Sequence, residues 1–169
     1  DTVEVAVFLD LMTIIDNFRQ DVPLLSVMRS MIGGFSIDEM IEIRLLHKRG
    51  AYYDAFFRYM HEGEDVLLRN KCRAFYEKIE NFREFSRGML LEEFVWHLLD
   101  RTGLYIYTGG MINGRQRQAN LRALADKAFT YKNVHGESIY GFLTYINAIK
   151  NKDLDVGQVK LLGENDDVV

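Results

Sequence analysis

The sequence predicts an all-α protein, an irregular helical bundle with at most one short β element. Apolar residues recur at the three- and four-residue spacing of an amphipathic helix through most of the chain. Glycines separate these segments, whereas Pro23 is the single proline among the 169 residues. With 48% hydrophobic residues and no Ser-, Gly- or Pro-rich run, the chain can form one sizeable core without internal linkers.

The first predicted helix covers about residues 2–17. Its apolar stripe consists of Val3, Val7, Leu11, Ile14 and Phe18. Asp21 is placed to cap the following helix, and Pro23 lies in the first turn of that helix, where a missing N–H costs nothing. An amphipathic helix followed by a second, capped helix is therefore expected at the start of the chain.

The stretch 23–40 predicts a helix, a glycine turn and the start of a second helix. Leu24, Met28, Met31 and Ile32 recur at helical spacing, and the pair Gly33 and Gly34 ends this helix where a positive φ is needed. Ser36 and Glu39 form a capping-box pattern for a helix that continues through Ile37, Met40, Ile41 and Leu45.

This helix–turn–helix presents backbone N–H groups and the positive end of a helix dipole to solvent, with Arg29 on its flank. Such an arrangement suits a phosphate group. The alternative is that the glycines only allow two helices to turn back on each other. The pattern by itself leaves both interpretations open.

The remaining segments continue the helical prediction. Residues 51–60 form a short aromatic helix, and residues 64–86 form the longest one, whose seam is Leu68, Cys72, Phe75, Ile79 and Phe82. A further helix around residues 90–101 ends at Thr102 and Gly103. The β-prone segment 104–114 predicts a short strand or extended turn. Ser138 is a candidate cap for the last helix, and residues 160–169 are expected to be a tail leaving the domain.

The helix that begins at Arg115 has an apolar stripe of Leu121, Leu124, Ala125 and Ala128. Arg115 and Arg117 place positive charge in its first turn, which is the unfavourable sign for the helix dipole. An anionic partner would explain this charge. A buried polar network of Arg117 and Asn120 would explain it equally well.

The overall charge of −4 is unlike that of a general nucleic-acid-binding protein, but the charge is unevenly distributed. Residues 1–42 carry eight acids and two arginines, whereas residues 101–132 carry six basic residues and one acid. A locally basic element can therefore still contact phosphate.

We find no sequence motif for catalysis. Neither a Walker-type phosphate loop nor a dinucleotide fingerprint occurs, and the four histidines lack zinc-ligand spacing. We therefore expect no enzyme activity and no cofactor in this chain. The single cysteine, Cys72, fits a reducing cytoplasm, and the lack of a long uncharged apolar span gives no support for membrane insertion or secretion. The ends of the chain suggest a piece of a longer protein.

Several runs closely resemble the AddA (RexA) subunit of bacterial ATP-dependent helicase–nucleases, which are superfamily 1 helicases of UvrD/RecB type. These runs span the chain and are residues 5–11, 15–24, 27–36, 109–124 and 162–169. The family usually has proline where Phe18 and Met31 stand, and Met31 could alter the entry to the glycine turn.

The resemblance implies a 2B accessory subdomain of UvrD/PcrA type. Residues 1–21 would be a leg from the second motor domain, residues 22–132 the helical core with a helix–turn–helix at 23–46, and residues 133–169 the return helix and leg. The parent would be an ATP- and Mg²⁺-dependent helicase and exonuclease that processes DNA ends for recombinational repair with an AddB/RexB-like nuclease partner subunit.

In related helicases the glycine-containing helix–turn–helix grips duplex DNA. The resemblance therefore implies DNA contacts by Arg29, Ser30, Gly33, Gly34 and Ser36. Arg115 and Arg117 are further candidates from the basic helix start. The competing hypothesis is a protein-interaction scaffold that docks the nuclease partner subunit or the rest of the same helicase chain. A basic patch at the turn would favour DNA, and a contiguous exposed apolar patch would favour a protein partner.

Overall fold

The computed structural model describes residues 2–165, and it describes the side chains of residues 2–154. The described part of the chain contains helices and no strand, which confirms the all-α prediction. The helices are α1 (Val3–Asp16), α2 (Asp21–Arg29), α3 (Ile37–Leu46), α4 (Tyr52–Glu62), α5 (Val66–Ser86), α6 (Leu91–Arg101), α7 (Leu104–Gly109), α8 (Gly114–His135) and α9 (Ile139–Asn165).

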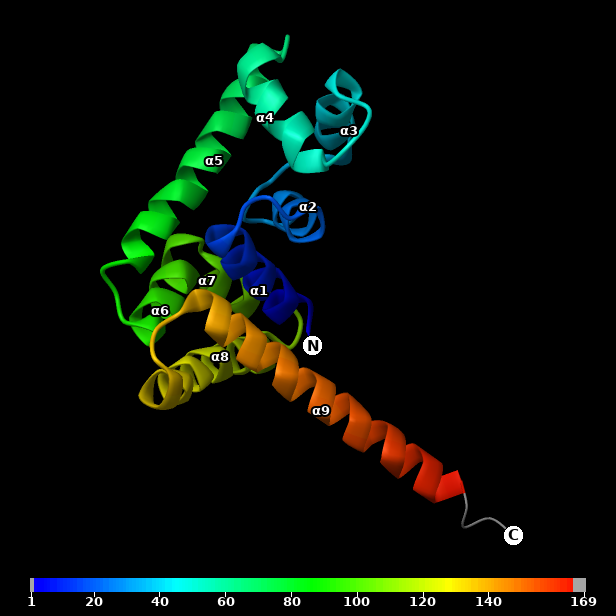
Figure 1. Ribbon diagram of the computed structural model, residues 1–169, viewed down its shortest axis with the longest axis vertical. Helices are drawn as coiled ribbons and strands as arrows, with labels where there is room; N and C mark the ends of the chain where they lie inside the picture. Colours follow the sequence, from blue (N-terminus) through cyan, green and yellow to red (C-terminus); the bar gives the residue numbers. More distant parts are fainter. Residues whose placement is uncertain (1, 166–169) are drawn as a thin grey trace.

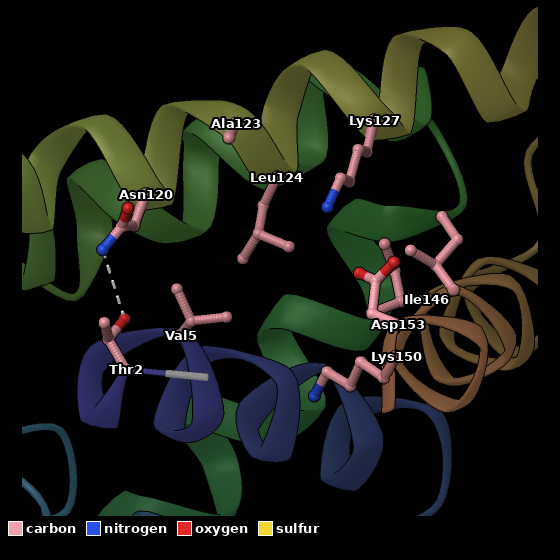
Figure 2. Close-up of a pocket in the computed structure, with 10 residues that line it drawn as sticks. Thr2, Val5, Asn120, Ala123, Leu124, Lys127, Ile146, Lys150 and Asp153 are labelled. Carbon is pink, nitrogen blue, oxygen red and sulfur yellow. Dashed lines mark hydrogen bonds between the residues drawn. The ribbon is translucent and has the colours of Figure 1, made fainter. Parts of the chain in front are cut away.

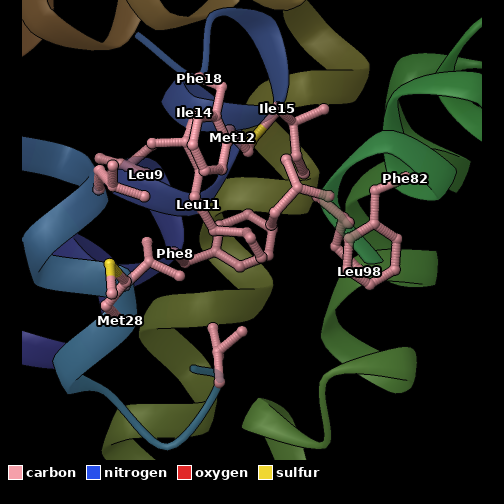
Figure 3. Packing of buried hydrophobic residues seen from close by; sticks show 14 of the residues in the cluster. Phe8, Leu9, Leu11, Met12, Ile14, Ile15, Phe18, Met28, Phe82 and Leu98 are labelled. Atoms are coloured by element: carbon pink, nitrogen blue, oxygen red, sulfur yellow. The ribbon is translucent and has the colours of Figure 1, made fainter. Parts of the chain in front are cut away.

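Helix α1 lies at the centre of the bundle, in contact with α2, α5, α8 and α9. Its side chains Phe8, Leu11, Met12, Ile14 and Ile15 are fully buried. Figure 3 shows them meeting side chains of the surrounding helices. The sequence predicted an amphipathic helix with one apolar stripe, but α1 is buried on most sides because helices surround it. The predicted leg at residues 1–21 thus contains the central core helix, and the proposed domain boundaries stay a prediction.

Helix α5 forms one long side of the molecule, with α3 and α4 near its start and α6 near its end (Figure 1). The predicted seam is confirmed, since Leu68, Cys72, Phe75, Ile79 and Phe82 are all buried. The predicted aromatic helix is α4. Its Phe56 packs with Phe18 and Phe75, at ring-centroid distances of 5.4 and 6.1 Å.

The predicted role of Asp21 is wrong. Its carboxylate accepts hydrogen bonds from the backbone N–H groups of Tyr52 (2.7 Å) and Tyr53 (3.0 Å), so it caps α4 rather than α2. Helix α2 begins at Asp21 itself, and its N-cap residue, Gln20, makes no side-chain capping bond. A carboxylate in the first turn still favours the dipole of α2, while its oxygens join α2 to α4.

In the predicted strand or extended turn at 104–114, residues 104–109 are helical, so a strand is wrong there, whereas residues 110–113 form a turn. Gly103 has a φ of +71° and precedes α7, in which Leu104 and Thr108 are buried one turn apart. The predicted Ser138 cap is confirmed, because the Gly141 N–H donates to the Ser138 hydroxyl at 3.1 Å.

Helix α9 projects from the body of the molecule, as Figure 1 shows, and it continues to Asn165. The tail expected from residue 160 is therefore helical as far as residue 165, and residues 166–169 lie outside the described part. Among the described residues, no helix is both long enough and apolar enough to cross a membrane.

Candidate nucleic-acid interface

Three backbone hydrogen bonds hold the glycine turn, which connects α2 to α3, against the end of α2. The N–H groups of Gly33, Gly34 and Phe35 donate to the carbonyls of Val27, Ser30 and Met28, at 3.2, 2.8 and 2.9 Å. Helix α2 ends at Arg29, earlier than its apolar spacing predicted, because these bonds fold the chain back at once.

The two glycines are required for different reasons. Gly34 has a φ of +68°, which confirms the predicted left-handed position and which side chains with a Cβ adopt at a cost. Gly33 has no positive φ, but a Cβ there would lie 2.6 Å from both Cα and the carbonyl oxygen of Met28. The turn therefore depends on close backbone approach at one glycine and on backbone conformation at the other.

The predicted capping box at the start of α3 is confirmed. The Glu39 N–H donates to Ser36 Oγ at 3.1 Å, and the Ser36 N–H donates to Glu39 Oε2 at 3.2 Å. Lys71 of α5 completes this arrangement, because its Nζ donates to the Gly34 carbonyl at 2.7 Å and to Glu39 Oε2 at 2.6 Å. Sequence reasoning missed Lys71, since nothing in its local pattern connects α5 with a turn far away in the chain.

The charges at the turn are nearly balanced. Lys71 is paired with Glu39, and Asp38 adds an exposed acid to the first turn of α3. Ser30 is also engaged, because its hydroxyl donates to the Val27 carbonyl at 2.7 Å and accepts from the Ile32 N–H at 3.1 Å. Arg29 is exposed, and its side chain makes no ion pair or hydrogen bond with the described residues. It is the cation at this turn that is free to meet a phosphate.

The start of α8 is the second predicted basic element. Its N-cap residue, Asn113, has a φ of +60° and makes no side-chain capping bond, and the first turn contains no acid. Arg115 is exposed on this turn. The Gly114 N–H donates to the Met111 carbonyl at 2.9 Å, but the positive end of the helix dipole and the Arg115 guanidinium still favour an anion at this helix start.

Arg117 takes part in the buried polar network that the sequence left open as an alternative. Its Nη1 donates to Glu4 Oε2 at 2.6 Å, and its Nε donates to the Ile112 carbonyl at 3.0 Å. Asn120 Nδ2 lies 3.5 Å from Glu4 Oε1 and 3.5 Å from Thr2 Oγ1; Figure 2 shows the bond to Thr2. The network ties the first turn of α1 to the first turns of α8.

Glu4 is the buried member of this network, with a side chain that is 2% exposed. Burial by itself would raise the pKa of the Glu4 carboxyl, but hydrogen bonds from Thr2, its own backbone N–H, Arg117 and Asn120 outweigh burial and lower that pKa below its ordinary value. The carboxylate is therefore charged at neutral pH and cancels much of the positive charge of Arg117.

One cavity brings the two predicted basic elements together. It has a volume of about 270 Å³, and its lining comes from α1, the end of α2, α7 and the start of α8. The lining residues are Val3, Glu4, Val7, Arg29, Ser30, Met31, Leu104, Tyr107, Thr108, Met111 and Arg117. Arg29 and Arg117, which are far apart in the sequence, therefore share one surface. Gly33, Gly34 and Ser36 are not part of the lining and shape the turn beside it.

A larger cavity of about 480 Å³ lies between α1, α8 and α9. Figure 2 shows Lys127 of α8 and Lys150 of α9 at this cavity, with Asp153 beside them. Burial lowers the pKa of Lys150, and the negative charge of Asp10 partly offsets that effect. Because two acids accompany the lysines, this cavity is a weaker candidate for contact with an anion.

Helix α3 exposes an apolar stripe. Ile37, Ile41 and Leu45, spaced by four residues, are 55%, 50% and 57% exposed. The sequence predicted that the helix continues through these apolar residues without assigning them to the core, and in the structure Ile43 is the fully buried residue of α3. Asp38 and Glu42 lie exposed beside the stripe. Because a contiguous exposed apolar patch is the feature expected for a protein partner, this face of α3 favours protein interaction.

Within the described residues, no group of three or more His, Cys, Asp or Glu side chains could hold a metal ion. The fold and the site together define a helical module with a buried core, a hydrogen-bonded glycine turn and a partly basic surface beside that turn. No protein-family model matches the chain.

The chain is similar over its full length to curated proteins whose names describe the A subunit of an ATP-dependent helicase/nuclease. It is 43% identical over 169 residues to the protein of Alkaliphilus metalliredigens and 41% identical over 174 residues to that of Clostridium novyi, in both cases across all of this chain. It is 41% identical over 168 residues to the protein of Acetivibrio thermocellus, across 99% of this chain.

The chain spans only 13–14% of the length of these relatives. It therefore corresponds to a region of the A subunit of an ATP-dependent helicase/nuclease, which confirms the resemblance found in the sequence.

Proposed function

We propose that this region is a non-catalytic module that positions duplex DNA for a helicase–nuclease. It would contact phosphate groups through Arg29, Arg115 and the uncapped start of α8. The observation that carries this proposal is the cavity that Arg29 and Arg117 both line, because it places the exposed Arg29 beside the start of α8. Two segments that the sequence picked out separately form one surface, and the names of the relatives supply the DNA-processing context.

The residues of the site would have different tasks. Arg29 and Arg115 are exposed and supply charge. Gly33 and Gly34 set the path of the backbone, and the Ser36 capping box fixes the start of α3. Arg117 would orient the start of α8 through Glu4 and add little net charge. No group in this set is a clear reader of base edges, so we expect binding without sequence preference.

The affinity for duplex DNA should be modest because few cations are free. Two to four neutralised phosphates correspond to a dissociation constant on the order of 10⁻⁴–10⁻⁶ M near physiological salt. The logarithm of the affinity should fall by about 0.9 per neutralised phosphate for each tenfold increase in salt. A steeper dependence would require basic residues beyond those of this surface.

The activity of the longer protein is part of the same proposal. The parent would bind ATP and Mg²⁺, unwind DNA ends, degrade them, and act with an AddB/RexB-like nuclease partner subunit in the cytoplasm. This chain carries none of the phosphate-binding sequence motifs, so we expect titration calorimetry with Mg·ATP to give no specific binding heat. Saturable binding of one nucleotide would contradict the assignment to a non-catalytic module.

A second candidate function is protein interaction through α3. The exposed stripe of Ile37, Ile41 and Leu45 lies between acids, which would repel DNA phosphates and suit a partner surface with apolar and basic residues. The two functions use different faces and are compatible with each other. Variants of each face can therefore test them separately.

The duplex proposal can be tested by fluorescence anisotropy with a labelled hairpin duplex at low salt. Arg29→Ala and Arg115→Ala should each weaken binding several-fold, whereas Arg58→Ala, which removes an exposed arginine of α4, should not. Gly34→Asp should weaken binding more than Gly34→Asn, because the two side chains have nearly the same shape and differ in charge. Circular dichroism would confirm that each variant is folded.

If Arg29→Ala and Arg115→Ala bind as tightly as the parent chain, the surface around the cavity has no role in DNA contact. The α3 scaffold function would then be the better explanation of the module.

A further inference from the structure

A groove of about 430 Å³ runs between α5 and α6, away from the glycine turn. Its α5 side is one helical stripe, and its α6 side consists of two residues one turn apart. The lining residues are Ala74, Glu77, Lys78, Asn81, Phe82 and Phe85 from α5, with His97 and Arg101 from α6. None of these residues belongs to the surface proposed for duplex DNA.

The groove contains an exposed aromatic platform. Phe85 is 50% exposed, and its ring centroid lies 4.9 Å from that of His97. The buried ring of Phe82 also packs against His97, with ring centroids 6.1 Å apart. An aromatic ring held in place by a second ring but still open to water is suited to stacking against a flat ligand.

Positive charge lies beside this platform. Lys78 is half-buried and Arg101 is exposed, and neither side chain has a hydrogen bond or ion pair within the described part of the chain. Glu77 is the one acid in the lining. No carboxylate of the described residues pairs with the Lys78 ammonium, and burial lowers the pKa of this group. A bound phosphate would supply a partner anion.

The spacing along α5 suits a ligand longer than one nucleotide. Lys78 and Phe85 are separated by seven residues, or roughly 10 Å at 1.5 Å per residue. A base on Phe85 would therefore leave a neighbouring phosphate near Lys78. Bases of a duplex stack on each other and have no free faces, whereas an unpaired strand can offer a base to an aromatic ring.

We propose that the α5–α6 groove binds single-stranded DNA, with a base stacked on Phe85 and phosphates held by Lys78 and Arg101. This site is separate from the duplex contact at Arg29 and does not depend on it. A module with both sites would hold the paired and unpaired parts of one DNA molecule on different faces.

The test uses the 169-residue chain and a fluorescein-labelled dT₁₂ strand, with anisotropy measured at low salt. Phe85→Leu keeps an apolar side chain but removes the aromatic face, and it should weaken binding about five- to one-hundred-fold. Phe85→Trp keeps the aromatic face and should bind at least as tightly as the parent chain. Lys78→Gln should weaken binding and reduce its salt dependence, while Lys78→Arg should retain both.

Three arms identify the ligand and the site. Arg29→Ala should weaken binding of the hairpin duplex and leave the affinity for dT₁₂ unchanged. Phe85→Leu should weaken binding of dT₁₂ and leave the affinity for the hairpin duplex unchanged. Free dTMP should bind far more weakly than dT₁₂. The proposal is overturned if the parent chain does not bind dT₁₂, if Phe85→Leu binds as well as Phe85→Trp, if dTMP binds as tightly as the strand, or if Phe85→Leu weakens duplex binding equally.

Discussion

Removal of the Arg117 guanidinium should destabilise the protein strongly, because it leaves the Glu4 carboxylate buried without its charged partner. Breaking a buried ion pair in this way costs about 3–5 kcal/mol. The Glu4 side chain is 2% exposed, but that of Arg117 is 29% exposed, so water reaches part of the pair. We therefore expect Arg117→Ala to cost about 3 kcal/mol, at the low end of this range. For a chain of this size, that corresponds to a fall in Tm of roughly 6–12 °C.

The loss of stability caused by Arg117→Ala should depend on pH. Because the pKa of Glu4 is lowered by folding, its contribution to stability is present at neutral pH and is lost as the pH falls through the folded-state pKa. In Arg117→Ala the hydrogen bonds from Thr2, the Glu4 backbone N–H and Asn120 remain, but loss of the charged donor raises the folded-state pKa of Glu4 relative to that in the parent chain. The difference in unfolding free energy between the parent chain and the variant should therefore be largest near neutral pH and shrink as the solution is acidified through and below the ordinary pKa of a glutamate, about 4.3.

Urea unfolding followed by circular dichroism, at neutral pH and again at acidic pH, would measure the effect of Arg117→Ala on the free energy of unfolding. Glu4→Gln serves as the matched control, because it keeps the shape and removes the charge that must be buried. It should cost less than Arg117→Ala at neutral pH, and the double variant should be more stable than the sum of the single losses predicts. A melting temperature of Arg117→Ala within about 1 °C of the parent would refute the assignment of this network as stabilising.

The packing supports further predictions. Phe75→Ala, in the middle of the α5 seam, should lower the free energy of unfolding by about 3–5 kcal/mol through cavity formation, and a thermal melt shifted by less than a degree would contradict this. Gly33→Ala should destabilise the protein by about 1–3 kcal/mol, because the new Cβ would collide with backbone atoms. Gly34→Ala should destabilise it less, by about 1–2 kcal/mol, because its Cβ has open space and only the positive φ is unfavourable. Urea titrations of the two variants would rank them. Asp21→Ala should cost about 0.5–2 kcal/mol by uncapping α4, measured in the same way. Burial raises the pKa of the Cys72 thiol to about 12. A thiol reagent at mildly alkaline pH should therefore modify Cys72 only after denaturation. Rapid labelling of the folded chain would be inconsistent with the buried position of this thiol.

Features that depend on neighbouring residues were predictable from the sequence. The Ser36 and Glu39 capping box, the Ser138 cap and the buried seam of α5 are set by short spacings, and the structure confirms all three. Gly34 was predictable for the same reason, since a glycine after an apolar helical run commonly takes a positive φ.

Features that depend on distant contacts were not predictable. Asp21 could cap either of two helices, and its sequence neighbours favour the one that the fold does not use. Segment 104–109 alternates like a strand, but an all-α bundle offers it no partner strand, and the buried pair Leu104 and Thr108 forms a helical face instead. Lys71 reaches the glycine turn only because α5 passes beside it.

The charge of α3 restricts how the helix–turn–helix can meet DNA. Asp38, Glu39 and Glu42 outnumber Arg44 on this helix, and its exposed stripe is apolar. Insertion of α3 into a DNA groove would therefore bring acids and bare aliphatic groups toward phosphates. Arg29 is at the end of α2, on the cavity shared with the start of α8. Phosphate contact is thus favoured at the edge of the motif nearest α8, and the exposed face of α3 is left for a protein surface.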